Sequence, residues 1–149
     1  MDRRNAGGPL NLYVESSAMA ARLLGQVQGE LVRDLLERSE NVFSSELLLL
    51  ECDRALIRAE SAGELSDAAA AGWRATLNLE SRYWTLLRIE GEVLERARRA
   101  FPLEPVRTLD AIHLSTLLLV RSIFADAELL SFDERIRANA KALGFRLAA

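Results

Sequence analysis

The chain has 149 residues, of which 50% are hydrophobic and 28% charged, and its formal net charge is −3. This length fits one domain, and the apolar fraction is too high for a disordered chain. A single cysteine, Cys52, excludes the disulfide-rich secreted scaffolds. The acidic balance excludes a uniformly basic nucleic-acid binder but leaves room for a local basic rim around an acidic site.

No targeting or membrane segment is visible in the sequence. The longest apolar runs, at 47–50 and 117–120, fall far short of the roughly 18 residues that span a bilayer. Residues 1–8 are polar and are not followed by the apolar stretch of a secretory signal. We therefore expect a flexible leader at 1–8, one domain over residues 9–149, no membrane association and a cytoplasmic location.

The first third of the chain alternates strand and helix patterns. Residues 10–15 alternate apolar and polar side chains, which predicts a strand. Helices are predicted at 16–24, where Ser16 or Ser17 can cap the first turn, and at 30–39. A brief strand at 41–43 and a helix at 46–61 follow.

The same alternation continues to the end of the chain. A helix at 65–79 precedes an aromatic and aliphatic strand at 83–89. A helix at 91–101 is stopped by prolines, and a strongly apolar helix occupies 108–121. The remaining elements are a strand at 128–132, a helix at 134–143 and a strand at 145–147. Short strands between longer helices indicate an α/β domain with a parallel sheet covered on both faces.

One acidic residue lies on an apolar helix face. Glu51 follows Leu47 by four residues and Leu48 by three, so it belongs to the stripe that packs inward. A carboxylate there is costly unless it is paired, binds a metal or opens into a cleft. Pairing with Arg54 or Arg58 is the structural alternative.

Three further acids have ordinary structural explanations when each is taken alone. Asp110 lies in the first turn of an apolar helix, where a negative charge is favourable. Asp133 precedes a helix and would be a normal N-cap. Glu15 ends the first predicted strand and could simply be solvated there.

The placement of these acids suggests a shared role. Glu15 and Asp133 follow predicted strands, and ligands bind at the carboxyl ends of strands in open α/β sheets. Carboxylates that meet there would repel one another unless a cation lay between them. Mg²⁺ and Mn²⁺ prefer oxygen ligands, and such ions can polarise a phosphodiester and activate water.

Four segments resemble, in order and spacing, the motif blocks of the PIN-domain ribonucleases, and most closely those of the VapC-type toxins of bacterial toxin–antitoxin pairs. The resemblance covers roughly residues 10–148. The segments are LYVESSAM, SSELLLLECDRAL, VRTLDAIHLSTLLL and LLSFDERIRANAKALGFRL.

This resemblance implies a three-layer α/β/α sandwich around a parallel sheet with strand order 3-2-1-4-5. It also implies metal-dependent RNA cleavage by four acids, and carried over they are Glu15, Glu51, Asp110 and Asp133 with Mg²⁺ or Mn²⁺. By the same resemblance, Ser17 and Ser131 would support the carboxylates or the metal-bound waters. A homodimer and a cognate antitoxin lying over the acidic cleft are the partners that it implies.

One position departs from the family pattern. The family's first acid is almost always aspartate, whereas this chain has Glu15, whose carboxylate lies one methylene farther from the strand. A misplacement of about 1 Å can cost roughly 10²-fold in rate. The alternative to an active ribonuclease is therefore a weakened or silent PIN domain that binds RNA or a protein partner, and a metal-dependent DNA nuclease is a further rival.

Two other residues near the acids have separate expected roles. His113, the only histidine, follows Asp110 by one helical turn, and we expect it to pack or to support the acids rather than to act as a base. Arg135 comes two residues after Asp133 and is the preferred candidate for contacting RNA phosphate.

Overall fold

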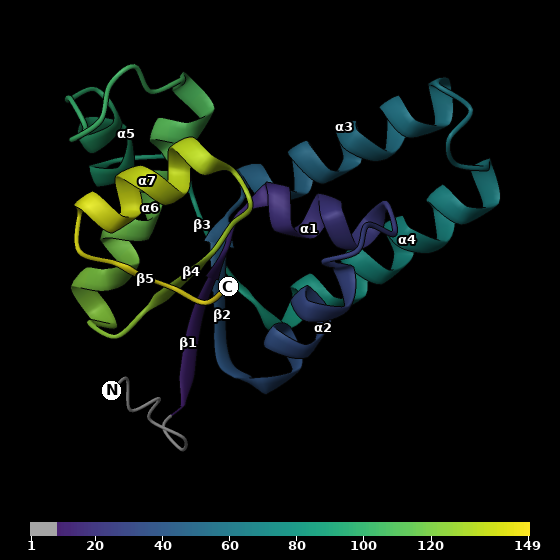
Figure 1. Ribbon diagram of the computed structural model, residues 1–149, viewed down its shortest axis with the longest axis horizontal. Helices are drawn as coiled ribbons and strands as arrows, with labels where there is room; N and C mark the ends of the chain where they lie inside the picture. The colour runs from purple at the N-terminus through teal and green to yellow at the C-terminus, as the bar shows by residue number, and fades with distance from the viewer. Residues whose placement is uncertain (1–8) are drawn as a thin grey trace.

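The computed structural model describes residues 9–149, and the leader expected at 1–8 lies outside the described residues. A five-stranded parallel sheet forms the centre (Figure 1). Its order is β3-β2-β1-β4-β5, which confirms the strand order expected from the family resemblance. The strands are β1 (Leu10–Val14), β2 (Ser39–Ser45), β3 (Thr85–Leu87), β4 (Glu128–Leu130) and β5 (Arg146–Leu147).

The central strand β1 supplies side chains to both faces of the sheet. Leu12 and Val14 belong to one buried apolar cluster and Tyr13 to the other, because successive side chains of a strand point to opposite faces. All three are completely buried. Strands buried on both faces are typical of parallel sheets covered by helices.

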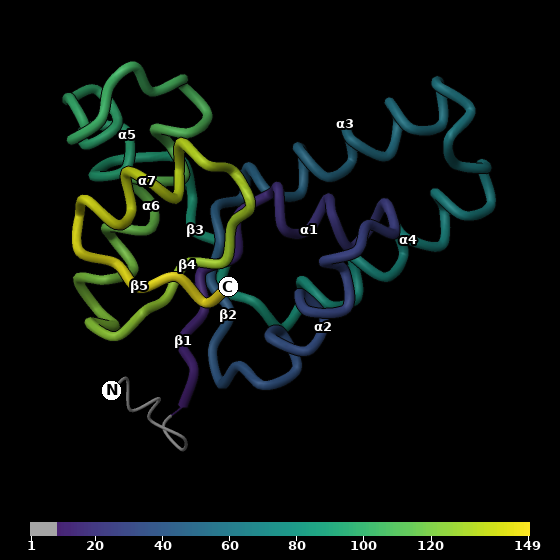
Figure 2. Tube along the Cα trace, in the orientation of Figure 1, coloured from purple at the N-terminus to yellow at the C-terminus, as the bar shows by residue number. Residues whose placement is uncertain are grey.

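Four helices cover the first face of the sheet (Figure 1). They are α1 (Ser16–Leu23), α2 (Gly29–Arg38), α3 (Leu47–Ser61) and α4 (Asp67–Glu80). Their apolar stripes meet the sheet in a core that includes Met19, Val32, Leu48, Leu56 and Leu77. Figure 2 shows that α3 and α4 run side by side in opposite directions and extend away from the sheet.

Three helices cover the opposite face. They are α5 (Glu92–Ala97), α6 (Thr108–Ile123) and α7 (Glu134–Ala142). Leu114, Leu117 and Ile136 from these helices pack against Tyr13 and Leu129 of the sheet. The two helical layers and the sheet between them confirm the α/β/α sandwich.

Several predicted boundaries are wrong. The helix expected at 91–101 ends at Ala97, because Phe101 turns into the second core and its N–H bonds to Glu104. The strand expected at 83–89 begins only at Thr85, since Tyr83 lies in a 3₁₀ turn, η1 (Ser81–Tyr83).

The start of α1 also differs from the prediction. Glu15 is the N-cap residue of α1, and it makes no side-chain hydrogen bond to the helix backbone. Ser16 and Ser17 lie inside the first turn, and their hydroxyls bond to acidic side chains instead.

Within residues 9–149, none of the helices combines the length and apolarity needed to cross a bilayer.

Candidate active site

The four acids singled out in the sequence follow the carboxyl ends of strands or begin the helices that come next. Glu15 follows β1 directly, and Asp133 follows β4 and caps α7. Glu51 lies in the second turn of α3, which starts beyond β2, and Asp110 lies in the first turn of α6. Because parallel strands share one carboxyl edge, this topology places acids from distant parts of the chain at one end of the molecule.

Glu15 is buried and held by two serines. Its side chain is only 4% exposed, so it is not a solvated strand end. Ser17 donates to Glu15 Oε2, and Ser131 donates to the same oxygen at 2.7 Å. The backbone N–H groups of Phe132 and Asp133 in turn donate to the two serine hydroxyls at 2.9 and 3.1 Å. The serine protons are thereby directed at the carboxylate.

Asp110 and Asp133 share one positively charged partner, Arg107. Arg107 Nε donates to Asp110 Oδ2 at 3.0 Å, and a terminal guanidinium nitrogen lies 3.5 Å from Asp133 Oδ2. The other oxygen of Asp133 accepts the backbone N–H groups of Arg135 and Ile136, so the predicted N-cap is confirmed. Arg107 therefore ties the start of α6 to the start of α7.

Glu51 faces a buried polar network rather than the arginines of its own helix. His113 Nε2 lies 2.6 Å from Glu51 Oε1, and Ser16 donates to the same oxygen at 2.6 Å. Within residues 9–149 Glu51 forms no ion pair with Arg54 or Arg58, so the expected structural alternative is wrong. On its other side, His113 Nδ1 lies 2.9 Å from the hydroxyl of Tyr13.

The protonation of this network follows from burial and hydrogen bonding. Burial strongly raises the pKa of Tyr13, so its hydroxyl keeps its proton and can donate to His113 Nδ1. In the tautomer that accepts this bond at Nδ1, the Nε2–H of His113 donates a hydrogen bond to Glu51 Oε1. Burial on its own would raise the pKa of Glu51, but the hydrogen bonds from His113 and Ser16 outweigh it and hold that pKa below its usual value.

The contacts link the predicted residues into two groups that meet at α1 and α6. One group runs from Glu15 through Ser131 to Asp133 and on through Arg107 to Asp110. The other contains Glu51 with its hydrogen-bonding partners. Sequence reasoning missed Arg107, Ser16 and Tyr13 as members of these groups. The VRTLD and YVESS segments contain all three, but spacing alone does not show their partners.

The chemistry of the donors fits a hard divalent cation, but their arrangement does not yet form a ligand group. Within residues 9–149, Glu15 Oε1, Glu51 Oε2 and Asp110 Oδ1 accept no protein hydrogen bond, so three carboxylates each keep one oxygen for a ligand. In the same described range, however, no three acidic, histidine or cysteine side chains come together closely enough to hold a metal ion.

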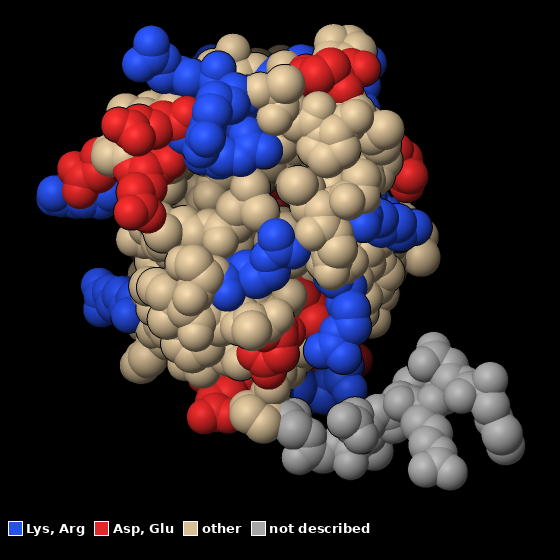
Figure 3. Space-filling model, turned by 90° about the vertical axis from the view of Figure 1, so that its left-hand side faces the viewer, with Lys and Arg blue, Asp and Glu red and all other residues tan. Residues whose placement is uncertain are grey.

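An open depression lies between α7 and the segment before α6. It has a volume of about 300 Å³ and is lined by Leu103, Glu104, Pro105, Glu134, Arg135, Ala138 and Asn139. Arg135 is exposed, and within residues 9–149 its side chain has no hydrogen bond or ion pair. Figure 3 views the face formed by α5, α6 and α7 and shows basic side chains in separate groups with acidic ones between them. Positive charge on this face is local.

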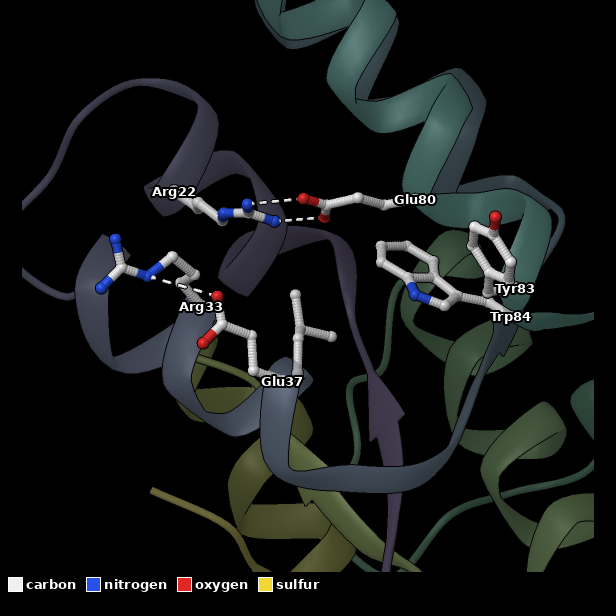
Figure 4. Close-up of a pocket in the computed structure, with 7 residues that line it drawn as sticks. Arg22, Arg33, Glu37, Glu80, Tyr83 and Trp84 are labelled. Atoms are coloured by element: carbon white, nitrogen blue, oxygen red, sulfur yellow. Dashed lines mark hydrogen bonds and ion pairs between the residues drawn. The ribbon is translucent and has the colours of Figure 1, made fainter.

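A second hollow, of about 220 Å³, lies between α1, α2 and η1 (Figure 4). Its charged residues pair with one another, since Arg22 forms two hydrogen bonds with Glu80 and Arg33 lies 3.7 Å from Glu37. None of the residues predicted to form the site lines this hollow. It is therefore separate from the acidic groups.

Comparison with known proteins identifies one family. The sequence profile of the PIN domain matches residues 12–142, a range that contains all four acids and both supporting serines. None of the curated proteins matches the chain.

Proposed function

Because this chain belongs to the PIN domain family, whose members are typically metal-dependent nucleases, we propose that it is a divalent-metal-dependent endoribonuclease. The observation that carries the proposal is the contact between Glu15 and Ser131. It joins the acid after β1 to the segment that holds Asp133 after β4. The serine hydroxyls donate hydrogen bonds to the buried carboxylate and thereby fix its orientation. A catalytic site requires a carboxylate of fixed orientation, whereas a solvated residue at a strand end does not.

Glu15, Glu51, Asp110 and Asp133 are the residues that would hold Mg²⁺ or Mn²⁺. When bound, such an ion supplies a polarised phosphodiester and an activated water. Ser17 and Ser131 fix the extra rotatable bond that glutamate has at position 15. Arg135 lines the depression and is exposed, and in this proposal it contacts an RNA phosphate.

We further propose that the protein is the toxin of a type II toxin–antitoxin pair, acts as a homodimer and is covered by a cognate antitoxin. The resemblance of its four motif blocks to VapC-type toxins supports this role. Exposed apolar side chains also support it, because Leu31 on α2 and Leu50 on α3 are 43% and 59% exposed. Apolar side chains on outer helix faces suit a partner helix. A gene for a small DNA-binding protein directly upstream is expected, and a solitary gene would count against the pairing.

The first test compares cleavage of single-stranded RNA and DNA in Mg²⁺ and in Mn²⁺. Wild type is expected to cut RNA, and Asp110→Asn is expected to lose cleavage by at least about 10²-fold while keeping its fold. Asp34→Asn is the matched control, because Asp34 lies exposed on α2 outside the acidic groups and pairs only with Arg33 in the described residues. Cleavage of DNA alone would replace the ribonuclease assignment by the deoxyribonuclease one.

A silent PIN domain is the second candidate, and two observations favour it. The acids do not form a three-ligand group within residues 9–149, and position 15 carries glutamate. Such a protein would retain labelled RNA on a filter with equal affinity in metal and in chelator, and would leave the RNA uncut. RNA cleavage that chelator abolishes excludes this candidate.

A further inference from the structure

Arg107 occupies an unusual position among the acids of the site. It is the residue before the first turn of α6, and its backbone carbonyl accepts the N–H of Ala111 at 2.9 Å. The backbone of Arg107 is therefore fixed by the helix, whereas its side chain is 64% exposed. From this position the guanidinium reaches Asp110, three residues along the same helix, and Asp133 at the start of α7.

Arg107 engages the one oxygen of Asp133 that a divalent ion would need, whereas Asp110 keeps its Oδ1 for a ligand. Arg107 contacts Oδ2 of both aspartates, and Asp133 Oδ1 is already committed to two backbone N–H groups. Asp133 therefore has no second uncommitted oxygen to offer. An ion that binds both Asp110 and Asp133 must displace the guanidinium from Asp133 Oδ2.

We propose that Arg107 is a built-in counter-cation that competes with the divalent metal ion for Asp110 and Asp133. This inference rests on the proposed function, because it takes these two acids as metal ligands. The guanidinium neutralises two neighbouring carboxylates that would otherwise repel each other. It leaves when the metal binds, which its exposed and flexible side chain permits. Arg107 is thus a positioning residue that sets the metal concentration at which the site fills.

The size of the effect follows from competition. Only molecules in which Arg107 has left the aspartates can bind the metal ion. The apparent dissociation constant is therefore the intrinsic one divided by the fraction of such molecules. Exposed ion pairs are only modestly stable, so removing Arg107 is expected to tighten metal binding by about threefold to tenfold. A tight buried pair would have a much larger effect, but the exposure of Arg107 excludes that case.

The test is calorimetric titration of the full chain with Mn²⁺ and without RNA, for wild type, Arg107→Gln and Arg146→Gln. Arg146 is the matched control, because it is 68% exposed and pairs with one carboxylate, Glu128, at 3.0 Å on the β4–β5 side of the sheet. Arg107→Gln is expected to bind Mn²⁺ about threefold to tenfold more tightly, whereas Arg146→Gln matches wild type. Detectable binding only in Arg107→Gln would support the proposal even more strongly.

Three outcomes would overturn the proposal. These are equal affinity of Arg107→Gln and wild type, weaker binding by Arg107→Gln, and no Mn²⁺ binding by either protein at millimolar concentration. A fall in melting temperature of Arg107→Gln without tighter binding would make Arg107 only a tie between α6 and α7. RNA cleavage by wild type, lost in Asp110→Asn, decides the proposed function separately. The inference can therefore fail while the ribonuclease assignment stands.

Discussion

The longer side chain of glutamate at position 15 is held by hydrogen bonds from two serines, Ser17 and Ser131. An aspartate at this position would carry its carboxylate one methylene closer to β1 and away from Ser17 and Ser131. We expect Glu15→Asp to lower RNA cleavage by roughly 10²-fold, the cost of a displacement of about 1 Å. The measurement is the single-turnover rate on a labelled RNA, with circular dichroism to check the fold.

The opposite result would carry a clear meaning. If Glu15→Asp cleaves RNA and wild type does not, the chain is a silenced member of its family and the serine contacts only stabilise the fold. Ser131→Ala provides the intermediate case. It keeps the glutamate but removes one of the two donors, so its rate is expected to lie between those of wild type and Glu15→Asp.

Glu51 gives the site a pH-dependent contribution to stability. Its pKa in the folded protein is below the unfolded value, which is about 4.3 for glutamate. The ionised form therefore stabilises the fold above the unfolded pKa, and this contribution is lost as the pH falls through the lower, folded value. The free energy of unfolding of Glu51→Gln is expected to be about 1–3 kcal/mol lower than that of wild type at pH 7. This difference is expected to shrink progressively below pH of about 4.

Urea unfolding at pH of about 7, 5 and 3 measures this difference between Glu51→Gln and wild type. Glu37→Gln is the control, because Glu37 is an exposed carboxylate on α2 and its loss should change stability little at any pH. A deficit of Glu51→Gln that is the same at all three pH values would mean that the amide disturbs packing and that the charge of Glu51 contributes nothing.

At the scale of elements, the start of α7 combines two roles in one side chain. Asp133 caps the helix with one oxygen and faces Arg107 with the other. Asparagine caps helices as well as aspartate does, whereas alanine does not. The free energy of unfolding of Asp133→Asn is therefore expected to lie within about 0.5 kcal/mol of the wild-type value. That of Asp133→Ala is expected to be about 1 kcal/mol lower than wild type.

RNA cleavage separates these two roles. Both variants are expected to be inactive, because each removes the negative charge. An active Asp133→Asn would show that Asp133 serves only as the helix cap. Unfolding in urea and cleavage of the same RNA, measured on both proteins, distinguish the two roles.

Local signals in the sequence account for the elements that were predicted well. Asp133 before α7 and Gly144 after it are strong end signals, and Gly144 adopts a positive φ of 89°. The end of α5 could not be predicted in this way, because the helical pattern continues beyond Ala97. What ends the helix is the burial of Phe101 against α6 and α7, a contact made only in the folded chain.

In the candidate site, too, some features could be predicted from the sequence and others could not. The four acids are visible in the sequence because carboxylates on apolar faces or after strands are unusual. Their partners are not visible, because Glu51 and His113 are 62 residues apart and Ser131 and Glu15 are 116 apart. Helical spacing suggested Arg54 or Arg58 as the partner of Glu51. The contact between Glu51 and His113 exists only because α3 and α6 both begin at the carboxyl edge of the sheet.

At the scale of the whole molecule, one sheet separates two apolar cores. Leu56 on α3 belongs to the first core and Leu114 on α6 to the second, and both are completely buried. Adjacent residues of β1 serve both cores, so loss of one core should loosen the other. We expect Leu56→Ala and Leu114→Ala each to cost about 2–5 kcal/mol and to unfold in a single transition.

The two tryptophans make this expectation testable. Trp73 and Trp84 pack against the first core, so their fluorescence reports that layer, while far-ultraviolet circular dichroism reports the helices of both layers. The two signals should change together in Leu114→Ala, although its mutation is in the core that contains neither tryptophan. Separate transitions would show that the two layers unfold independently.

The strand order also determines when the site first exists during protein synthesis. β1 is made first but has β4 as one of its two neighbours, and the second serine on Glu15 comes only at position 131. A ribosome that has not yet translated β4 holds a chain with Glu15, Glu51 and Asp110 but without Asp133 or Ser131. Such a nascent chain cannot assemble the complete acidic group. As a nuclease, such a protein would remain harmless to the messenger that encodes it until β4 and the residues after it have been translated.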